Sequence, residues 1–195
     1  MGTTRDEQAE QRRTALMDAA LAVFAAKGVD GASIKNIAAE AGVTPGLVYH
    51  YFESKTHLVT TVLRERGFGP RLRELLAEAA DKPATEVLSL VVGGFQQVLA
   101  DNAQLVELFF GASRSNDEIH AAMGDFVRDG RAMLADYLRS RAEAGELRPH
   151  DAEVAATALF ATVAMGVRTA TPIDAGELVR IVLLGTLVRE GDFHD

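Results

Sequence analysis

The sequence predicts an all-α protein of about nine helices, arranged in two parts. Apolar residues recur every three or four positions along most of the 195 residues, and no segment alternates apolar and polar residues between turns as a strand would. Hydrophobic residues make up 48% and charged residues 25%, which are ordinary values for a globular chain long enough to bury a sizeable core. We expect one domain over residues 1–55 and a second, helical domain over residues 56–195.

The first predicted helix covers residues 15–28, where Leu16, Ala20, Val23 and Phe24 form one apolar stripe. Two short helices follow, and a further helix begins after Ser54 and is interrupted by the Gly-Phe-Gly-Pro sequence at its end. An Asp-x-x-Glu pattern just after a proline predicts a capping box at the start of the last helix. The remaining predicted helices span residues 71–80, 84–100, 103–112, 117–144, 151–170 and 174–189.

Residues 33–54 predict two short helices joined by a tight turn. Ser33 can cap the first helix through its hydroxyl, and Gly42 supplies the left-handed backbone of the turn without a Cβ clash. Thr44 suits the N-cap of the second helix and Pro45 its first position, where a missing N–H costs nothing. The second helix is too short to be stable alone, so the first helix and the segment that follows must hold it. This arrangement is typical of a helix-turn-helix, which enters the major groove of DNA.

Between Arg12 and Leu63 the chain resembles the TetR family of bacterial transcriptional regulators. The resemblance rests on the leading helix and on the motifs Gly42-Val43-Thr44, Leu47-Val48-Tyr49-His50-Tyr51-Phe52 and Ser54-Lys55. It implies a three-helix, homeodomain-like DNA-binding domain at residues 1–55 and an effector-binding and dimerisation domain at residues 56–195. It also implies a ligand-responsive repressor that binds a palindromic operator, an inverted repeat in double-stranded DNA, as a homodimer.

Several polar or outward-facing residues of the motif are candidates for contact with DNA. Lys35 can donate to a guanine edge, although a solvated surface lysine is the alternative. The second helix has no Arg, Asn or Gln, so we expect apolar contact of Leu47 with thymine methyl groups and close backbone approach at Gly46. Thr44, Tyr49, His50 and Lys55 suit phosphate oxygens. The predicted DNA-binding residues are Ser33, Lys35, Thr44, Pro45, Gly46, Leu47, Tyr49, His50 and Lys55.

Three further side chains near the motif allow two interpretations each. Tyr51 either packs beneath the motif or contacts DNA. Arg12 and Arg13 either reach the DNA backbone or an adjacent minor groove, or are only solvated. The net charge of −8 argues against a protein that coats nucleic acid indiscriminately. Binding therefore has to rely on the placement of a few cations rather than on a general positive field.

The last two predicted helices each carry one face of mixed small and large apolar residues, which permits close helix crossing. One interpretation is that both helices only complete the core of a monomer. The family resemblance instead implies that they pair with their symmetry mates, so that two recognition helices reach successive major grooves. The predicted interface residues are Ala158, Thr162, Met165, Leu178, Ile181, Val182 and Gly185.

Between residues 95 and 165 the sequence is rich in large, adaptable side chains interleaved with polar ones. An ordinary core with solvated polar faces explains many of them singly; together they suit a mostly apolar cavity with a few hydrogen-bonding groups. We expect a small apolar or amphipathic effector there, which tilts the helix that begins after Ser54 about a hinge at residues 67–70 and so releases DNA. The predicted ligand-binding residues are Phe95, Gln96, Phe109, Phe110, His120, Met123, Phe126 and Met165.

Other classes of protein fit the sequence less well. The chain has no cysteine, no uncharged stretch as long as the ~20 residues of a membrane helix, and a polar start unlike a signal peptide, so we expect a cytoplasmic protein. It also lacks a catalytic triad, a phosphate loop and a metal-binding pair, so we expect no enzyme, no cofactor and no metal. Asp117, Glu118 and His120 are interpreted as a polar helix start. The alternative is a helical protein-interaction module, or a small-molecule-binding protein without sequence-specific DNA binding.

Overall fold

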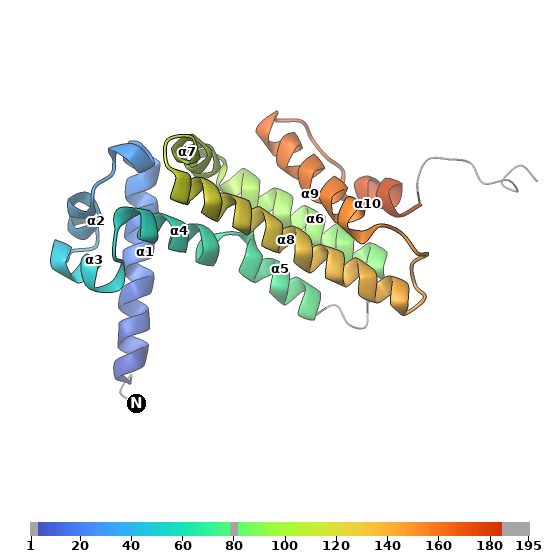
Figure 1. Ribbon diagram of the computed structural model, residues 1–195, viewed down its shortest axis with the longest axis horizontal. Helices are drawn as coiled ribbons and strands as arrows, with labels where there is room; N and C mark the ends of the chain where they lie inside the picture. The colour runs from blue at the N-terminus through green and yellow to red at the C-terminus, as the bar shows by residue number, and fades with distance from the viewer. Residues whose placement is uncertain (1–3, 79–81, 185–195) are drawn as a thin grey trace, which may run out of the picture. The chain divides into compact units, whose positions relative to one another are not determined.

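A computed structural model describes residues 4–78 and 82–184, and within these ranges the chain forms helices and no strand (Figure 1). The predicted all-α class is therefore confirmed. The ten helices described are close to the predicted number, the bounds of α1 and α5 differ from the prediction, and the part of the last predicted helix beyond residue 184 lies outside the described residues. The helices are α1 (Arg5–Gly31), α2 (Ile34–Glu40), α3 (Pro45–Tyr51), α4 (Lys55–Arg66), α5 (Phe68–Ala77), α6 (Ala84–Asp101), α7 (Ala103–Ser113), α8 (Asp117–Glu143), α9 (Ala152–Arg168) and α10 (Ala175–Leu184).

The helices belong to two compact units that interleave along the chain. The first unit comprises residues 1–69 and 102–127, and the second comprises residues 70–101 and 128–195. The first unit therefore holds α1 to α4, α7 and the start of α8, and the second holds α5 from Pro70 on, α6, α9, α10 and the rest of α8. Compact units need not coincide with functional domains, so the expected boundary between domains after residue 55 stays a prediction.

Helix α1 is longer than the sequence pattern predicts, because it begins ten residues before Ala15. Thr4 caps it: its hydroxyl accepts from the Glu7 amide, and the Glu7 carboxylate accepts from the Thr4 amide. Near the other end Gly28 has a φ of 74°, a left-handed conformation that bends the chain before Val29. In the first unit α1 packs against α2, α4 and α7, and α3 packs against α2.

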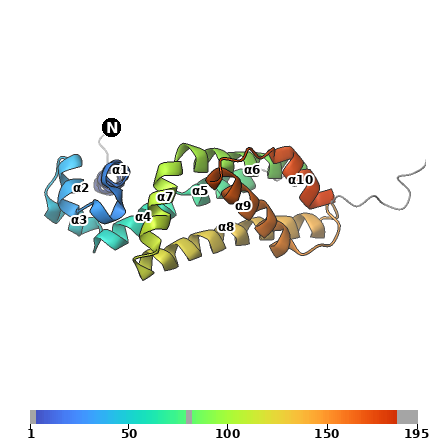
Figure 2. The ribbon, with the colours of Figure 1, turned by 90° about the horizontal axis from the view of Figure 1, so that it is seen from above.

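In the second unit α6 packs against α9 and α10, and α9 packs against α10 (Figure 2). The apolar face expected on α9 divides in two. Ala155, Leu159 and Gly166 are buried, whereas Met165 on the same helix is exposed. Phe160 meets Phe95 of α6 with ring centroids 4.2 Å apart. The buried half of α9 thus builds the core of this unit, and the other half remains uncovered in the single chain.

The interruption predicted at residues 67–70 is much shorter in the structure. Helix α4 ends at Arg66, Gly67 is its C-cap, and α5 already begins at Phe68. Pro70 is accommodated because the first turn of a helix needs no N–H from that residue. A Cβ on Gly67 would lie 2.5 Å from the Leu63 carbonyl oxygen and 2.6 Å from the ring of Phe126, so this position has no room for a side chain.

Candidate DNA-binding interface

The corner between α2 and α3 has the backbone that the sequence predicts. Ser33 caps α2, its hydroxyl accepting from the Asn36 amide at 3.2 Å. Gly42 has a φ of 66°, and the amide of Val43 returns to the Ala38 carbonyl at 2.9 Å. Thr44 occupies the N-cap of α3 in an extended conformation, but its hydroxyl makes no capping hydrogen bond, so that hydroxyl is not committed to the helix.

Buried apolar side chains hold the short helix α3 on the rest of the first unit. Ile37 of α2, Val48 of α3 and Phe52 just after α3 are each at most 1% exposed and belong to one core cluster with α1 and α4. Helix α3 has only seven residues, so this packing rather than its own hydrogen bonds stabilises it. Val48 and Phe52 are thus part of the core.

The opposite side of α3 is exposed along its length. Thr44, Pro45, Gly46 and His50 are exposed, Tyr49 is 56% exposed, and Leu47 is partly exposed. Ser33 and Lys35 of the neighbouring corner are exposed as well. These predicted DNA-contacting residues therefore share access to solvent, and their individual contacts with DNA stay predictions.

Gly46 is not required by the fold of the protein. A Cβ there would have the Thr44 hydroxyl oxygen as its nearest neighbour, at 3.9 Å, which is ordinary van der Waals contact. The lack of a side chain at this exposed position thus leaves the backbone of α3 accessible to a close neighbour, without serving any internal packing.

Tyr51 packs within the protein. It is partly buried against the core cluster, and the ring of His50 meets it edge-on with centroids 5.1 Å apart. Of the two interpretations from the sequence, the structure favours packing beneath the motif.

Lys55, at the start of α4, has internal partners that the sequence did not predict. Its ammonium nitrogen lies 3.0 Å from the Val29 carbonyl oxygen, 3.1 Å from that of Ala32 and 3.4 Å from that of Asp30. An ammonium has three N–H donors, and these carbonyls can occupy all of them. The predicted contact of Lys55 with phosphate stays a prediction, and it competes with these bonds.

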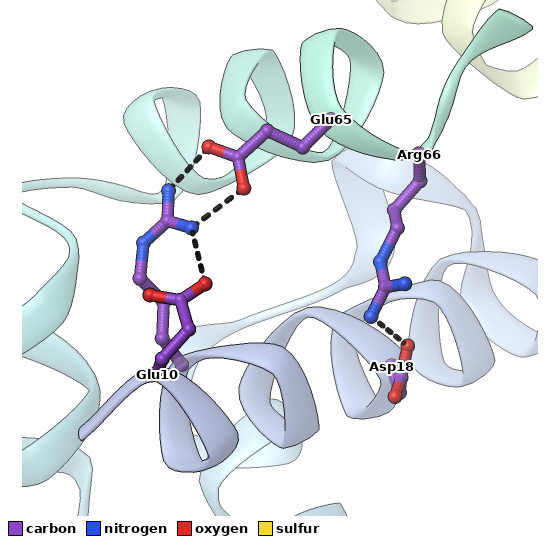
Figure 3. Close-up of polar contacts among 5 residues, drawn as sticks. Glu10, Asp18, Glu65 and Arg66 are labelled. Atoms are coloured by element: carbon purple, nitrogen blue, oxygen red, sulfur yellow. Dashed lines mark hydrogen bonds and ion pairs between the residues drawn. The ribbon is translucent and has the colours of Figure 1, made fainter. Parts of the chain in front are cut away.

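Two arginines and three acidic residues join α4 to α1 (Figure 3). We call Glu10, Arg13, Asp18, Glu65 and Arg66 the α1–α4 ion-pair cluster. Arg13 donates to both carboxylate oxygens of Glu65, at 2.6 and 2.5 Å, and lies 3.7 Å from Glu10. Arg66 pairs with Asp18 at 2.7 Å. The hydrogen bond from Arg13 lowers the pKa of the Glu65 carboxyl, and the same bond raises the pKa of Arg13.

From the sequence, Arg13 was expected either to contact DNA or to be solvated. No local pattern marks its partner, because Glu65 lies 52 residues away in the chain. The guanidinium of Arg13 also lies over the ring of Phe52, 5.8 Å from the centroid. Arg13 thus contacts α4 and the end of α3 at once.

The predicted ligand-binding residues are divided between the two units. Phe109 is buried edge-on against Phe24, Met123 packs against the first unit's core, and His120 is exposed. The exposure of Met165, 59%, suits its predicted place in an interface. A common ligand site stays a prediction. Phe109, Phe110, His120, Met123 and Phe126 lie in the first unit, and Phe95, Gln96 and Met165 lie in the second.

The predicted interface residues on α9 and α10 lie on accessible surface. Ile181 and Met165 are exposed, whereas Ala158, Thr162, Leu178 and Val182 are partly exposed. Val154, which is not among the predicted interface residues, is 64% exposed one turn before Ala158. Gly185 lies outside the described residues.

Known proteins share both the motif and the overall architecture of this chain. The family profile described as bacterial regulatory proteins of the tetR family matches residues 16–62, and that of the AefR-like transcriptional repressor C-terminal domain matches residues 98–172. The HTH-type transcriptional repressor KstR2 of Mycolicibacterium smegmatis is 29% identical over the full length of both chains.

Solved structures of other regulators have folds similar to that of this chain. SmeT in complex with triclosan superposes with a TM-score of 0.73 at 26% identity, covering 94% of this chain and 95% of SmeT. The fatty acid degradation regulator FadR of Bacillus halodurans gives 0.67 at 26% identity, covering 90% and 99%.

The fold, the exposed short helix and these matches define a transcriptional regulator of the helix-turn-helix class. The chain belongs to the TetR family. Among the residues that the structure describes, no helix is long and apolar enough to cross a membrane.

Proposed function

We propose that this protein is a ligand-responsive repressor that binds an inverted-repeat operator as a homodimer, in the cytoplasm. The observation that carries the proposal is the exposed side of α3, from Thr44 to His50, held rigidly on a buried corner. A short helix anchored in this way can enter a major groove without rearrangement. The predicted repressor mode is supported by the similarity over the full length to KstR2, a transcriptional repressor.

Contact with DNA would combine one basic side chain with the polar end of α3. Lys35 is exposed on α2 and is the candidate for a guanine edge. The free hydroxyl of Thr44, together with Tyr49 and His50, is suited to phosphate oxygens. Leu47 and Gly46 offer an apolar contact and a close backbone approach, respectively, as the sequence predicts.

The homodimer is supported by exposed apolar surface on α9 and α10. Val154, Met165, Ile181 and Leu184 are large apolar residues exposed on these two helices, which pack against each other. Soluble chains seldom leave such a group of apolar side chains in water, so a partner surface is expected. Self-pairing through a two-fold axis would present two copies of α3 about 34–36 Å apart, the repeat of the major groove.

Effector response is the second element of the proposal. SmeT is known in a complex with triclosan, and the Bacillus halodurans relative is a fatty acid degradation regulator; both names favour an apolar or amphipathic effector. The effector would change the equilibrium between two spacings of the recognition helices by no more than its differential affinity for them. Helix α4, which ends at the tightly packed Gly67, is the element proposed to tilt.

Selection of bound duplexes from random DNA tests the DNA-binding function. We expect an inverted repeat to be enriched and the protein–DNA complex to contain two chains. Lys35→Ala should alter the preferred bases at one position of each half-site, whereas a phosphate contact would change affinity without changing preference. A protein that enriches no sequence and remains a single chain in solution would instead be the interaction module or the simple ligand-binding protein named as alternatives.

A further inference from the structure

We propose that Arg13 is a positioning residue that fixes the orientation of α4 and of the recognition helix α3 on α1. This inference rests on the proposed DNA-binding function. It assigns to Arg13 a role without contact to DNA, in which the guanidinium joins three elements of the first unit.

The geometry of Arg13 favours an internal role over a phosphate contact. Both terminal nitrogens of the guanidinium donate to Glu65 in a bidentate arrangement, the strongest form of arginine–carboxylate pairing. The Arg13 side chain is only 26% exposed, and its guanidinium lies over the ring of Phe52. A phosphate that approached this guanidinium would meet the negative charge of the Glu65 carboxylate, which is unfavourable.

The polarity of the cluster specifies one arrangement of α4 on α1. Glu65 and Arg66 are consecutive residues of opposite charge, and their partners Arg13 and Asp18 have the complementary order along α1. Figure 3 shows Glu65 and Arg66 extending from α4 toward α1 at two separate points. Arg13 and Asp18 are five residues apart, or about 7.5 Å along the helix axis. A shift that brought Glu65 to Asp18 would oppose two carboxylates, which is unfavourable.

The same side chain connects this arrangement to the recognition helix. Phe52 is the C-cap of α3, is almost fully buried, and contacts Arg13 through its ring. A change in the Arg13–Glu65 pair therefore acts on the end of α3 as well as on the end of α4. The outward residues of α3 keep their positions only if Arg13 retains both its ion pair with Glu65 and its contact with Phe52.

The test compares Arg13→Gln with Lys27→Gln in the full-length protein. Lys27 is an exposed basic residue of α1, so its variant removes the same charge from the same helix without disturbing Glu65. With the operator selected by the wild type, Arg13→Gln should weaken binding about tenfold, a typical size for a coupled contact, and leave the salt slope unchanged. Lys27→Gln should stay within about threefold of the wild type.

Rescue and hydrogen exchange separate positioning from general stability. The charge swap Arg13→Glu with Glu65→Arg restores an ion pair, and we expect it to bind the operator more tightly than Arg13→Glu alone. Arg13→Gln should also raise the amide exchange rates of residues 48–52 at temperatures where the protein is fully folded, with little change in α7. Glu65→Gln, which keeps the side-chain size, provides the same comparisons if the Arg13 variants do not fold.

The outcomes distinguish this inference from the proposed function. If the wild type selects no operator, the proposed function fails, and unchanged exchange in α3 would independently overturn the positioning role. If the wild type binds its operator but Arg13→Gln and Lys27→Gln lose affinity equally, charge alone explains the effect. A salt slope lowered by about 0.9 in Arg13→Gln would identify a phosphate contact and also overturn the inference.

Discussion

Lys55→Met removes an ammonium that holds the end of α1 and keeps the apolar stem of the side chain. Two of the three carbonyl contacts, at 3.0 and 3.1 Å, have good hydrogen-bond distances, and the third, at 3.4 Å, is long and weak. Because Lys55 is partly exposed, water replaces some of each lost bond. We assign about 0.5–1 kcal/mol to each good contact. The expected loss of unfolding free energy is therefore about 1–2 kcal/mol.

This loss should lower the melting temperature by roughly 2–8 °C in a chain of this size. Circular dichroism melting of Lys55→Met against Lys27→Met measures it, since Lys27 is an exposed lysine of α1 and gives the matched charge control. A melting temperature for Lys55→Met within about 1 °C of the Lys27→Met value would refute the assignment of energy to these bonds.

The salt dependence of operator affinity tests the second role of Lys55. If the Lys55 ammonium still donates to the three carbonyls in the DNA complex, Lys55→Met has the same slope of log K against log salt as the wild type. If Lys55 leaves them for a phosphate, as the family resemblance implies, its loss reduces the slope by about 0.9 and weakens all sites alike.

Three further predictions follow from the geometry. Gly46→Ala should raise the stability of α3 by about 0.5–1 kcal/mol, because nothing obstructs the added Cβ. The same change should weaken operator binding if DNA approaches this backbone, so the melting temperature would rise while the operator affinity falls. Gly67→Ala should destabilise the protein by about 1–3 kcal/mol, because the Leu63 carbonyl and the Phe126 ring must move, and a melting temperature equal to that of the wild type would contradict this. The pKa of Glu65 is lowered in the native state. The ionised carboxylate therefore stabilises the fold fully above the ordinary Glu pKa of about 4.3, and this stabilisation is lost as the pH falls through the lowered native pKa. The difference in unfolding free energy between wild type and Glu65→Gln should shrink only in that acidic range.

The corner of the helix-turn-helix could be predicted from the sequence because its determinants are local. Ser33, Gly42 and Pro45 act on the backbone within a few residues of themselves, and the structure gives each the expected cap, left-handed turn or first helical position. The early start of α1 could also have been predicted from the sequence, since Thr4 and Glu7 have the spacing of a capping box. Helix α5 begins earlier than predicted because Pro70 falls within its first turn, where a proline does not break the helix.

The contacts of Lys55 and Arg13 could not be predicted in this way. Each depends on a partner at least 23 residues away, and no spacing rule for a helix or a turn connects them. A basic residue beside a DNA-binding motif suggests phosphate contact from the sequence alone, whereas its actual neighbours depend on how α4 crosses α1. The uncovered half of α9 is a similar case, because periodicity identifies apolar residues without telling which of them the single chain buries.

The ion pairs between α1 and α4 also determine where this regulator can be recombined with its relatives. A chimaera that keeps residues 1–54 and takes α4 from another protein retains Arg13 and Asp18 but loses the side chains that pair with them. A junction after Gly67 transfers the five charged residues together, along with the tight turn that ends α4. Sensors built by exchanging effector domains should therefore tolerate the later junction better than the earlier one.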